Sequence, residues 1–197
     1  MGNGTFKLID ILLKKPSFTS KDARAKGVHP SLLAYYAKAG YLERISRGVY
    51  RGLEKDRREL PLEWEDLIAT AQSIPRGVIC LISALAIYQL TDEIPRQFWI
   101  AVPQHSRPPK RPNARIIRMR DMKTGATRIK LGSATIKIFD PERSVIDAFR
   151  CLEKEIALKA LRSYLEGKYQ KPDIKKLLSY SKVLRTLISS YIEALIL

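Results

Sequence analysis

The 197-residue sequence has few of the residues that build metal centres or cross-links. It contains two cysteines, Cys80 and Cys151, and two histidines, His29 and His105. The cysteines lie far apart in apolar segments, and no CxxC pair or Cys/His cluster occurs, so a zinc site is not expected. The sequence therefore predicts no metal and no cofactor, and both cysteines are interpreted as small buried hydrophobic residues.

Long apolar runs and leader-like segments are also missing. No stretch approaches the ~18 apolar residues that would span a bilayer. The N-terminus has no charged region followed by an apolar one, so no signal peptide is expected. The sequence predicts a cytoplasmic protein with no membrane partner. Low-complexity segments are absent, and 45% hydrophobic residues suffice for one large domain or two small ones.

Acidic residues are in short supply relative to basic ones. Thirty-six Lys and Arg oppose 20 Asp and Glu, which gives a net charge of +16 and a pI near 10.0. A polyanion is the natural partner, because each neutralised phosphate releases a condensed counterion. A generally basic protein is one alternative. An anionic membrane is another, although a basic amphipathic helix with bulky apolar anchors is missing.

The charge changes sign along the chain and suggests a domain division. Residues 1–52 carry ten basic residues against three acidic ones, whereas residues 53–75 carry three against six. Together with Pro61, this change predicts a DNA-binding domain over 1–52, a linker over 53–60 and a C-terminal domain over 61–197.

The first domain has the pattern of three short helices followed by a hairpin. Thr5 is a candidate cap for the first helix, which Pro16 ends, and Thr19–Ser20 are candidate caps for a second that stops at Gly27. The third runs from Pro30 to Gly40, and residues 41–51 then alternate around a turn at 46–48. This order predicts a winged helix-turn-helix.

The rest is expected to be mixed α/β, ending in a helical region, so that the whole chain is α+β. We expect helices over 62–74 and 78–90, strands over 98–102, 115–120 and 134–139, and a proline-rich loop over 103–113. Asp140 is expected to cap a helix with Pro141 in its first turn. Further helices are expected over 156–165, 173–178 and 181–195.

The third helix is the candidate recognition helix. Its core-facing stripe is expected to be Leu33, Tyr36, Ala37 and Gly40, and its opposite face to be Ser31, Ala34, Tyr35 and Lys38. His29 and Ser31, at its N-terminal end, are candidates for base contacts, and Lys38 for a phosphate. The alternative is a small helical subdomain with a solvated basic face, in which both tyrosines belong to the core.

Two further groups are candidates for contact with DNA. Arg47, at the tip of the hairpin, suits a wing that enters the minor groove, where arginine is favoured. Ser20 and Lys21, at the start of the second helix, are candidates for holding a phosphate near free N–H groups.

The run SKDARAKGVHPSLLAYYAKAGYLERISRGVYR, residues 20–51, resembles the N-terminal domain of the AbiEi antitoxin family. That family shows an L-x-R-hydrophobic-x-R-G-x-Y hairpin, which is present here as Leu42, Arg44, Ile45, Arg47, Gly48 and Tyr50. PRGVICLISALAIYQLTDEIPRQFWIAVP (75–103) and FDPERSVIDAFR (139–150) resemble later parts of the family.

The resemblance implies a non-enzymatic antitoxin of a bacterial type IV toxin–antitoxin system. Such a protein binds repeats in its own promoter as a repressor, and its C-terminal domain opposes a nucleotidyltransferase toxin that acts on RNA, without a stable complex. It places Arg44, Arg47 and Tyr50 in the wing, and Ser31 and Tyr35 in the recognition helix. It makes 76–90, 92–95 and 140–150 the antitoxin segments.

Several residues of those segments have two interpretations. Arg76, Arg143, Asp147 and Arg150 are candidates for an antitoxin surface that faces toxin or RNA. Alternatively, Arg143, Asp147 and Arg150 form ion pairs along one helix. Ser83, in an apolar run, is expected to be a buried hydroxyl bonded to the backbone rather than a nucleophile.

Two other function classes remain open. A restriction-like nuclease would hold Mg²⁺ on carboxylates, for which Asp140 and Glu142 are the only candidates, although a helix cap disfavours them. An RNA-binding adaptor would use Arg115, Arg118 and Arg120 along one strand edge. We therefore expect double-stranded promoter DNA and a toxin as partners, with RNA as a further possibility.

Overall fold

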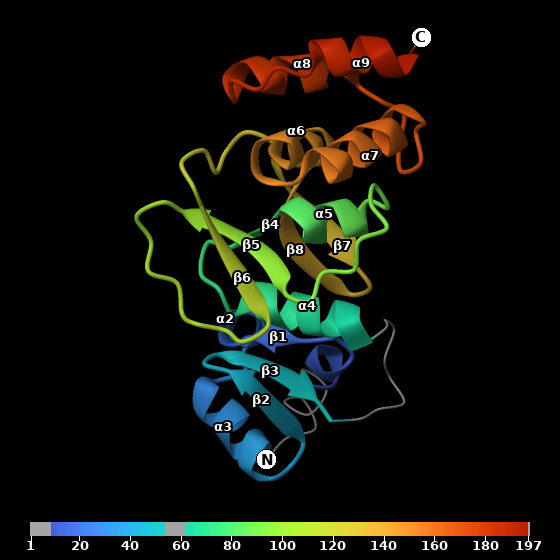
Figure 1. Cartoon of the computed structure of the whole chain (residues 1–197). Helices are drawn as coiled ribbons and strands as arrows, with labels where there is room; N and C mark the ends of the chain where they lie inside the picture. Colours follow the sequence, from blue (N-terminus) through green and yellow to red (C-terminus); the bar gives the residue numbers. More distant parts are fainter. Residues whose placement is uncertain (1–8, 54–61, 197) are drawn as a thin grey trace. The chain divides into compact units, whose positions relative to one another are not determined.

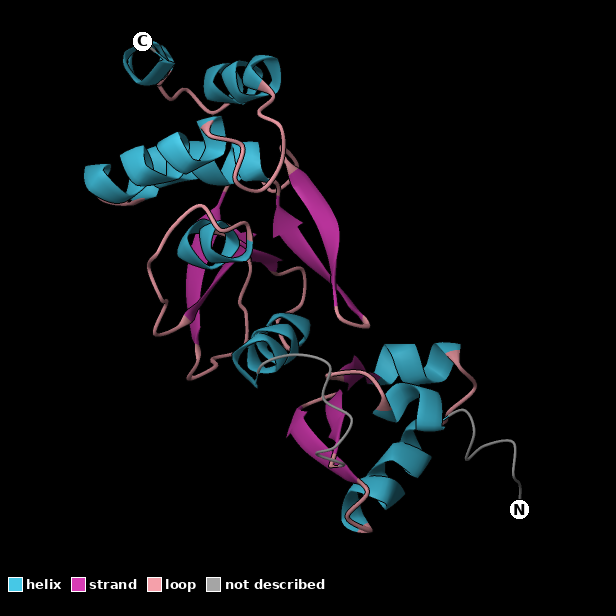
Figure 2. Cartoon of the chain, turned by 90° about the vertical axis from the view of Figure 1, so that its right-hand side faces the viewer, coloured by secondary structure: helices cyan, strands magenta, loops and turns pink. Residues whose placement is uncertain are grey.

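A computed structural model of the chain describes residues 9–53 and 62–196. It is a mixed α+β protein (Figures 1 and 2). Two compact units can be distinguished, a first unit of residues 1–75 with 129–136 and a second unit of residues 76–128 with 137–197. The expected linker at 53–60 falls almost entirely outside the described residues, whereas the two units divide between Pro75 and Arg76.

The first unit joins short helices to a small antiparallel sheet. Residues 9–13 are helical, and the predicted cap Thr5 lies outside the described residues. The sheet has the order β1-β3-β2. The elements in chain order are β1 (Phe18–Thr19), α2 (Ser20–Ala25), α3 (Pro30–Lys38), β2 (Leu42–Ser46), β3 (Val49–Gly52) and α4 (Leu62–Gln72).

Local sequence signals explain where α2 and α3 begin and end. The Thr19 hydroxyl accepts the Asp22 N–H at 3.1 Å, and an Asp22 carboxylate oxygen accepts the Thr19 N–H at 2.8 Å, so the two form a capping box. Gly27 (φ +78°) and Gly40 (φ +79°) lie in the left-handed region just beyond the two helices. Such positions favour glycine because it has no Cβ. These predicted boundaries are confirmed.

The core of the first unit lies between α3 and the sheet and includes residues from every described element up to β3. Leu12, Phe18 and Leu33 are almost fully buried there. Helix α4 also belongs to this unit: the Ser17 hydroxyl donates to the Gln72 side chain at 3.0 Å, and Arg51 contacts Asp66 at 3.2 Å. These contacts explain why the units divide after α4.

The second unit carries most of a sheet with the order β6-β5-β4-β8-β7. Strand β4 pairs antiparallel with β5 and parallel with β8, and β5 pairs parallel with β6. The strands are β4 (Val78–Ile79), β5 (Phe98–Pro103), β6 (Ala114–Met119), β7 (Ala126–Leu131) and β8 (Ala134–Phe139).

Helices of the second unit lie in layers on one side of this sheet (Figure 1). Helix α5 packs on β5 and against α6, and α6 in turn packs against α7 and α8. Their bounds are α5 (Leu81–Ile87), α6 (Pro141–Cys151), α7 (Lys154–Leu165), α8 (Ile174–Val183) and α9 (Ser189–Ile196). Asp140 caps α6 as expected, because its side chain accepts the Arg143 N–H at 2.9 Å.

Two expectations for the second unit were wrong in part, and one strand was missed. Residues 78–90 were expected to be one buried helix, but Ile79 pairs with Ile100 and Ile138 in the sheet before α5 begins. Strand β7 was not expected. The helix expected over 181–195 is divided, because α8 continues to Val183 and the chain turns at Arg185, at φ +53°, before α9 starts at Ser189.

In the described ranges, no helix combines the length and the apolar character that a bilayer crossing requires.

Candidate nucleic-acid interface

Helix α3 presents one buried and one exposed face. Leu33 and Tyr36 are buried in the core, and Ala37 is half-buried beside them. The predicted opposite face is exposed at all of its positions, Ser31, Ala34, Tyr35 and Lys38. The predicted division of the helix is therefore confirmed, except that Gly40, beyond its last residue, is exposed.

His29 and Ser31 form the N-terminal end of this helix together. The His29 Nδ1 atom accepts the Ser31 N–H at 3.3 Å and lies 2.7 Å from the Ser31 hydroxyl. Because Nδ1 accepts the backbone proton, the other ring nitrogen of a neutral His29 carries the hydrogen and can donate. Both side chains are exposed, so a donor and an acceptor are available at the first turn of α3.

Tyrosines line one side of α3. Tyr36 lies edge-on to both Tyr35 and Tyr41, with ring centroids 5.5 Å and 5.8 Å away. Tyr36 is 9% exposed, whereas Tyr35 is 63% exposed. The alternative that both Tyr35 and Tyr36 belong to the core is therefore wrong for Tyr35.

The hairpin of β2 and β3 carries Arg44 on a strand and Arg47 in the turn, and both are exposed. Gly48, next to Arg47, has φ +77°, which a tight hairpin turn requires of one of its central residues. Arg44 pairs in register with Tyr50, which is buried. The hairpin therefore holds its tyrosine in the core while leaving both arginines accessible.

The start of α2 is tied to this turn. The Ser20 N–H donates to the Gly48 carbonyl at 2.8 Å, and the Ser20 hydroxyl lies 3.4 Å from the same oxygen. Asp22 adds a negative charge in the first turn. Ser20 is thus engaged within the fold, while the neighbouring Lys21 is exposed. The structure gives Ser20 a role in holding α2 to the hairpin.

Basic side chains dominate the exposed surface of these elements. The exposed ones are Lys21, Arg24, Lys26, Lys38, Arg44 and Arg47. Within the described part of the chain, none of the six is in an ion pair; sequence reasoning had not singled out Arg24 and Lys26. Unpaired cations keep their full attraction for an anionic backbone, so this surface suits phosphate groups.

Two of the four predicted antitoxin residues, Arg143 and Asp147, are buried. Arg143 is 0% exposed, and its Nε donates to Asp147 at 2.7 Å. Asp147, also buried, accepts from Arg150 at 2.7 Å. The ion-pair interpretation of this helix is therefore the one observed, and Arg143 and Asp147 do not lie on a surface. Arg76 and Arg150 are exposed.

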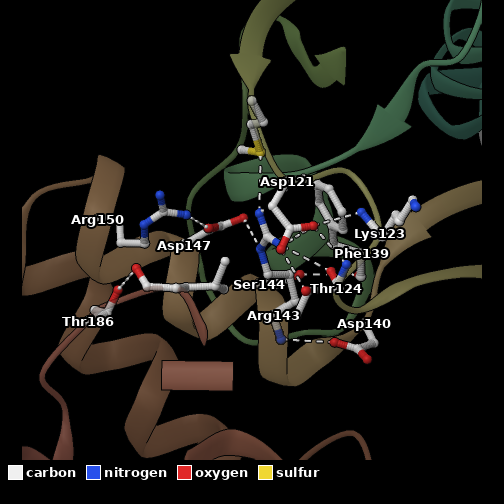
Figure 3. A network of polar contacts seen from close by, with 12 residues as sticks. Asp121, Lys123, Thr124, Phe139, Asp140, Arg143, Ser144, Asp147, Arg150 and Thr186 are labelled. Atoms are coloured by element: carbon white, nitrogen blue, oxygen red, sulfur yellow. Dashed lines mark hydrogen bonds and ion pairs between the residues drawn. The ribbon is translucent and has the colours of Figure 1, made fainter. Parts of the chain in front are cut away.

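Arg143 is also held by backbone groups of the loop between β6 and β7. Its terminal nitrogens donate to the carbonyl oxygens of Thr124, at 3.0 Å, and of Asp121, at 3.2 Å (Figure 3). The guanidinium lies over the Phe139 ring at 4.5 Å. A Cβ atom at Gly125 would lie 2.5 Å from the Arg143 Cβ, so the loop passes too close for any side chain there.

Asp140 and Glu142, the carboxylates considered for Mg²⁺, enclose a lysine instead. Lys176 Nζ lies 3.0 Å from Asp140 and 2.9 Å from Glu142. Glu142 also accepts from Tyr164 and Gln170, at 2.8 Å and 2.9 Å. Burial alone would lower the pKa of Lys176, but both carboxylates raise it above its ordinary value. The ammonium occupies the position between the carboxylates that a cation would need, which disfavours the nuclease hypothesis.

The three arginines of the RNA-adaptor hypothesis do not share one face of β6. Arg115 stacks over the Trp99 ring at 4.0 Å, whereas Arg118 and Arg120 line a cleft next to α6. Successive side chains of a strand point to opposite faces. Arg115 is an odd number of residues away from Arg118 and from Arg120, so its side chain points to the other face.

Ser83 is buried, as expected, and its hydroxyl accepts the Trp99 N–H at 2.8 Å. The side chain therefore links α5 to β5, as a structural hydroxyl does.

A comparison with protein-family models matches residues 7–51 to a family described as "Transcriptional regulator, AbiEi antitoxin". The matched range includes α2, α3 and almost all of the hairpin. A comparison with curated proteins gives no match. The likenesses at 75–103 and 139–150 lie outside the matched range and stay predictions. The resemblance to the AbiEi antitoxin family of transcriptional regulators is therefore confirmed for residues 7–51.

Proposed function

We propose that this protein is a DNA-binding autorepressor and the antitoxin of a bacterial type IV toxin–antitoxin system, acting in the cytoplasm. The first unit is a winged helix-turn-helix that binds double-stranded promoter DNA containing repeats. The second unit opposes a cognate nucleotidyltransferase toxin without a stable complex. The protein itself is not an enzyme, and it needs no cofactor.

The observation that carries the DNA-binding proposal is the exposed face of α3 beside the arginine-bearing hairpin. Helix α3 turns Ser31, Tyr35 and Lys38 away from the core, and a helix of this kind can enter the major groove. Unpaired basic side chains on α2, α3 and the hairpin supply the charge that attracts the phosphate backbone.

Each candidate residue then has a defined role. His29 and Ser31, at the N-terminal end of α3, reach base edges, and Tyr35 contacts a sugar or a thymine methyl group from the middle of the helix. Lys38 and Lys21 bind phosphates on either side. Arg44 and Arg47 belong to the wing, with Arg47 in the minor groove.

The antitoxin part of the proposal rests on the family match and on what the second unit leaves exposed. Arg76 and Arg150 are the predicted antitoxin residues that remain accessible to a partner. Because Arg143 and Asp147 are buried, their contribution to such a surface is to position Arg150 through the shared Asp147 carboxylate.

The DNA-binding proposal is tested with the full chain and the duplex that precedes its own coding sequence. Fluorescence anisotropy across a salt series should give a slope of about −0.9 for each phosphate neutralised. Arg47→Ala should weaken binding and make the slope shallower. Arg162→Ala, which removes the same charge from an exposed position on α7, is the matched control and should bind as the wild type does. Binding that ignores salt would refute the proposal.

The antitoxin proposal has a separate test. The toxin encoded beside this protein is expressed in growing cells, together with the wild type or with Arg47→Ala. Growth should be restored by both, although only the wild type represses a reporter under the same promoter. If Arg47→Ala fails to restore growth while it is produced at the normal level, the two functions are not divided as proposed.

A further inference from the structure

The second unit contains a cleft of about 670 Å³ that the DNA-binding proposal does not use. Strand β6 supplies Arg118, the bend just after it supplies Arg120, α6 supplies Arg150, and the turn after α8 supplies Arg185. Apolar side chains, among them Ile117 and Leu184, complete the wall. A volume of this size is in the range of small-molecule sites, which combine apolar walls with a few placed polar groups.

The charged side chains that line the cleft are mostly positive. Among the described residues, Asp121 is the only acidic one that lines the cleft, and the two Asp147 carboxylate oxygens are paired with Arg143 and Arg150. In the parts of the chain that the structure describes, neither Arg118 nor Arg185 is in an ion pair. Both side chains are exposed. Guanidinium groups without counter-charges along one concave wall raise the positive potential there.

Arg185 reaches the cleft from an uncommon backbone position. Its φ of +53° places it in the left-handed position that ends α8, where the Thr186 N–H donates to the Ser181 carbonyl at 2.8 Å. Glycine is the usual residue at this position because it has no Cβ. Gln89 ends α5 in the same conformation, so the backbone position by itself does not mark a site. At the end of α8, the residue in this position is an arginine that lines the cleft.

We propose that this cleft binds a nucleoside phosphate, either as a free nucleotide or as the terminal nucleotide of an RNA strand. Arginine forks match phosphate oxygens with paired hydrogen bonds, and arginines placed along the cleft suit a ligand with more than one anionic group. The apolar part of the wall provides a surface for the base. The site is separate from the proposed DNA-binding surface, since it lies entirely in the second unit.

The reactivity of the Cys151 thiol can be used to measure whether a ligand occupies the cleft. It lines the cleft and is exposed, whereas Cys80 is buried. Mass spectrometry after iodoacetamide treatment should find Cys151 modified in the native protein and Cys80 unmodified. Each ribonucleoside triphosphate, and a short single-stranded RNA, should slow the modification of Cys151 if its phosphates occupy the cleft. Inorganic sulfate at the same ionic strength is the control for non-specific charge.

Affinity is measured in parallel, by calorimetry for the nucleotides and by fluorescence anisotropy for a fluorescein-labelled single-stranded RNA. Arg118→Gln and Arg185→Gly should each weaken binding about tenfold, the effect of losing one charge-assisted contact. Arg185→Gly also relieves the left-handed strain, so its melting temperature should equal or exceed that of the wild type. Weaker binding in a variant that is no less stable cannot come from unfolding. Arg162→Gln, on α7, is the matched control.

The outcomes separate the two sources of the ligand. Saturable binding of the nucleotides alone identifies a free nucleotide, and binding of the RNA alone identifies an RNA end; either supports the proposal if Arg118→Gln and Arg185→Gly weaken it. Arg47→Ala should leave binding in the cleft unchanged while it weakens binding to duplex DNA. The cleft proposal can therefore be refuted while the DNA-binding proposal still holds. No saturable binding, or equal losses in Arg162→Gln, would overturn it.

Discussion

The backbone N–H of Ser20 donates to the carbonyl oxygen of Gly48 at 2.8 Å, so the first residue of α2 is fastened to the turn that carries Arg47. A helix start and a hairpin turn that are 28 residues apart are thereby held together. The basic residues next to each, Lys21 and Arg47, keep a fixed spacing. Such rigidity favours DNA binding, because less conformational entropy is lost when the complex forms.

Substitution of Gly48 should disturb this link. Gly48→Ala places a Cβ atom at φ +77° and 3.4 Å from the Ser20 hydroxyl, so it should lower the free energy of unfolding of the first unit by about 1–2 kcal/mol. DNA affinity should fall as well, because the strained position lies in the turn that carries Arg47 and contacts Ser20. Urea unfolding and anisotropy measure the two effects.

Gly27→Ala is the matched control, since Gly27 has φ +78° and no atom within 4 Å of an added Cβ. It should lose similar stability and keep its DNA affinity. Equal losses of affinity in both variants would show that the contact between Ser20 and Gly48 has no special part in DNA binding.

Lys38→Ala should weaken binding to every duplex by the same factor. Lys38 is the last residue of α3 and is exposed, so it is expected to contact a phosphate, which carries no sequence information. The slope of log affinity against log salt should become shallower by about 0.9. Anisotropy with a promoter duplex and a scrambled duplex measures it. A loss confined to the promoter duplex would instead place Lys38 on a base.

Removal of the buried guanidinium should destabilise the second unit strongly. Arg143→Ala leaves the buried Asp147 without its 2.7 Å partner in the core, and the breaking of such a pair costs about 3–5 kcal/mol. Urea unfolding followed by circular dichroism measures the change. Lys159→Ala, which breaks an exposed pair with Glu155 on α7, should have little effect. Similar losses in both variants would contradict the interpretation of Arg143 as a core residue.

Acid should weaken the loop that encloses Arg143. Burial alone would raise the pKa of Asp121, but hydrogen bonds from the Thr124 hydroxyl (2.6 Å) and N–H and from the Lys123 N–H, with the Arg143 charge, lower it. A carboxyl with a lowered pKa in the folded state stabilises the fold above its unfolded pKa of about 3.9. This contribution is lost as the pH falls below that value, because the unfolded state then binds more protons.

The measurement is urea unfolding from neutral to acidic pH. Asp121→Asn should be less stable than the wild type at neutral pH, and the difference should shrink as the pH falls toward the lower pKa of the folded state. A constant difference across that range would show that Asp121 does not titrate as expected.

Local signals were sufficient to predict α2 and α3 of the first unit. Thr19, Gly27, Pro30 and Gly40 mark helix ends by their own chemistry, so α2 and α3 were predicted close to their observed bounds. Strand β1 was missed because two residues carry no periodicity. Phe18 and Thr19 are extended only because β3 lies beside them, a partner about 30 residues away.

The errors in the second unit have the same origin. An apolar run such as 78–90 fits either a buried strand or a buried helix, and only the pairing of Ile79 with two other strands decides between them. Strand β7 was missed because none of its residues is fully buried, so the apolar alternation is weak.

The candidate residues of the first unit were mostly predictable, because their exposure follows from helical periodicity. The cleft was not predictable. Arg118, Arg150 and Arg185 are far apart in sequence, and each alone is an ordinary basic residue. Only the tertiary fold brings β6, the end of α6 and the turn after α8 to one cleft.

The close approach at Gly125 has a consequence for the history of this sequence. An added Cβ there would lie 2.5 Å from the Cβ of Arg143 and 2.8 Å from an Asp140 carboxylate oxygen, so the helix and the loop leave no space for a methyl group. A lineage that replaced the glycine first would lose the loop carbonyls that satisfy the arginine. The two positions therefore form an evolutionary unit, and related chains should retain both or have changed both.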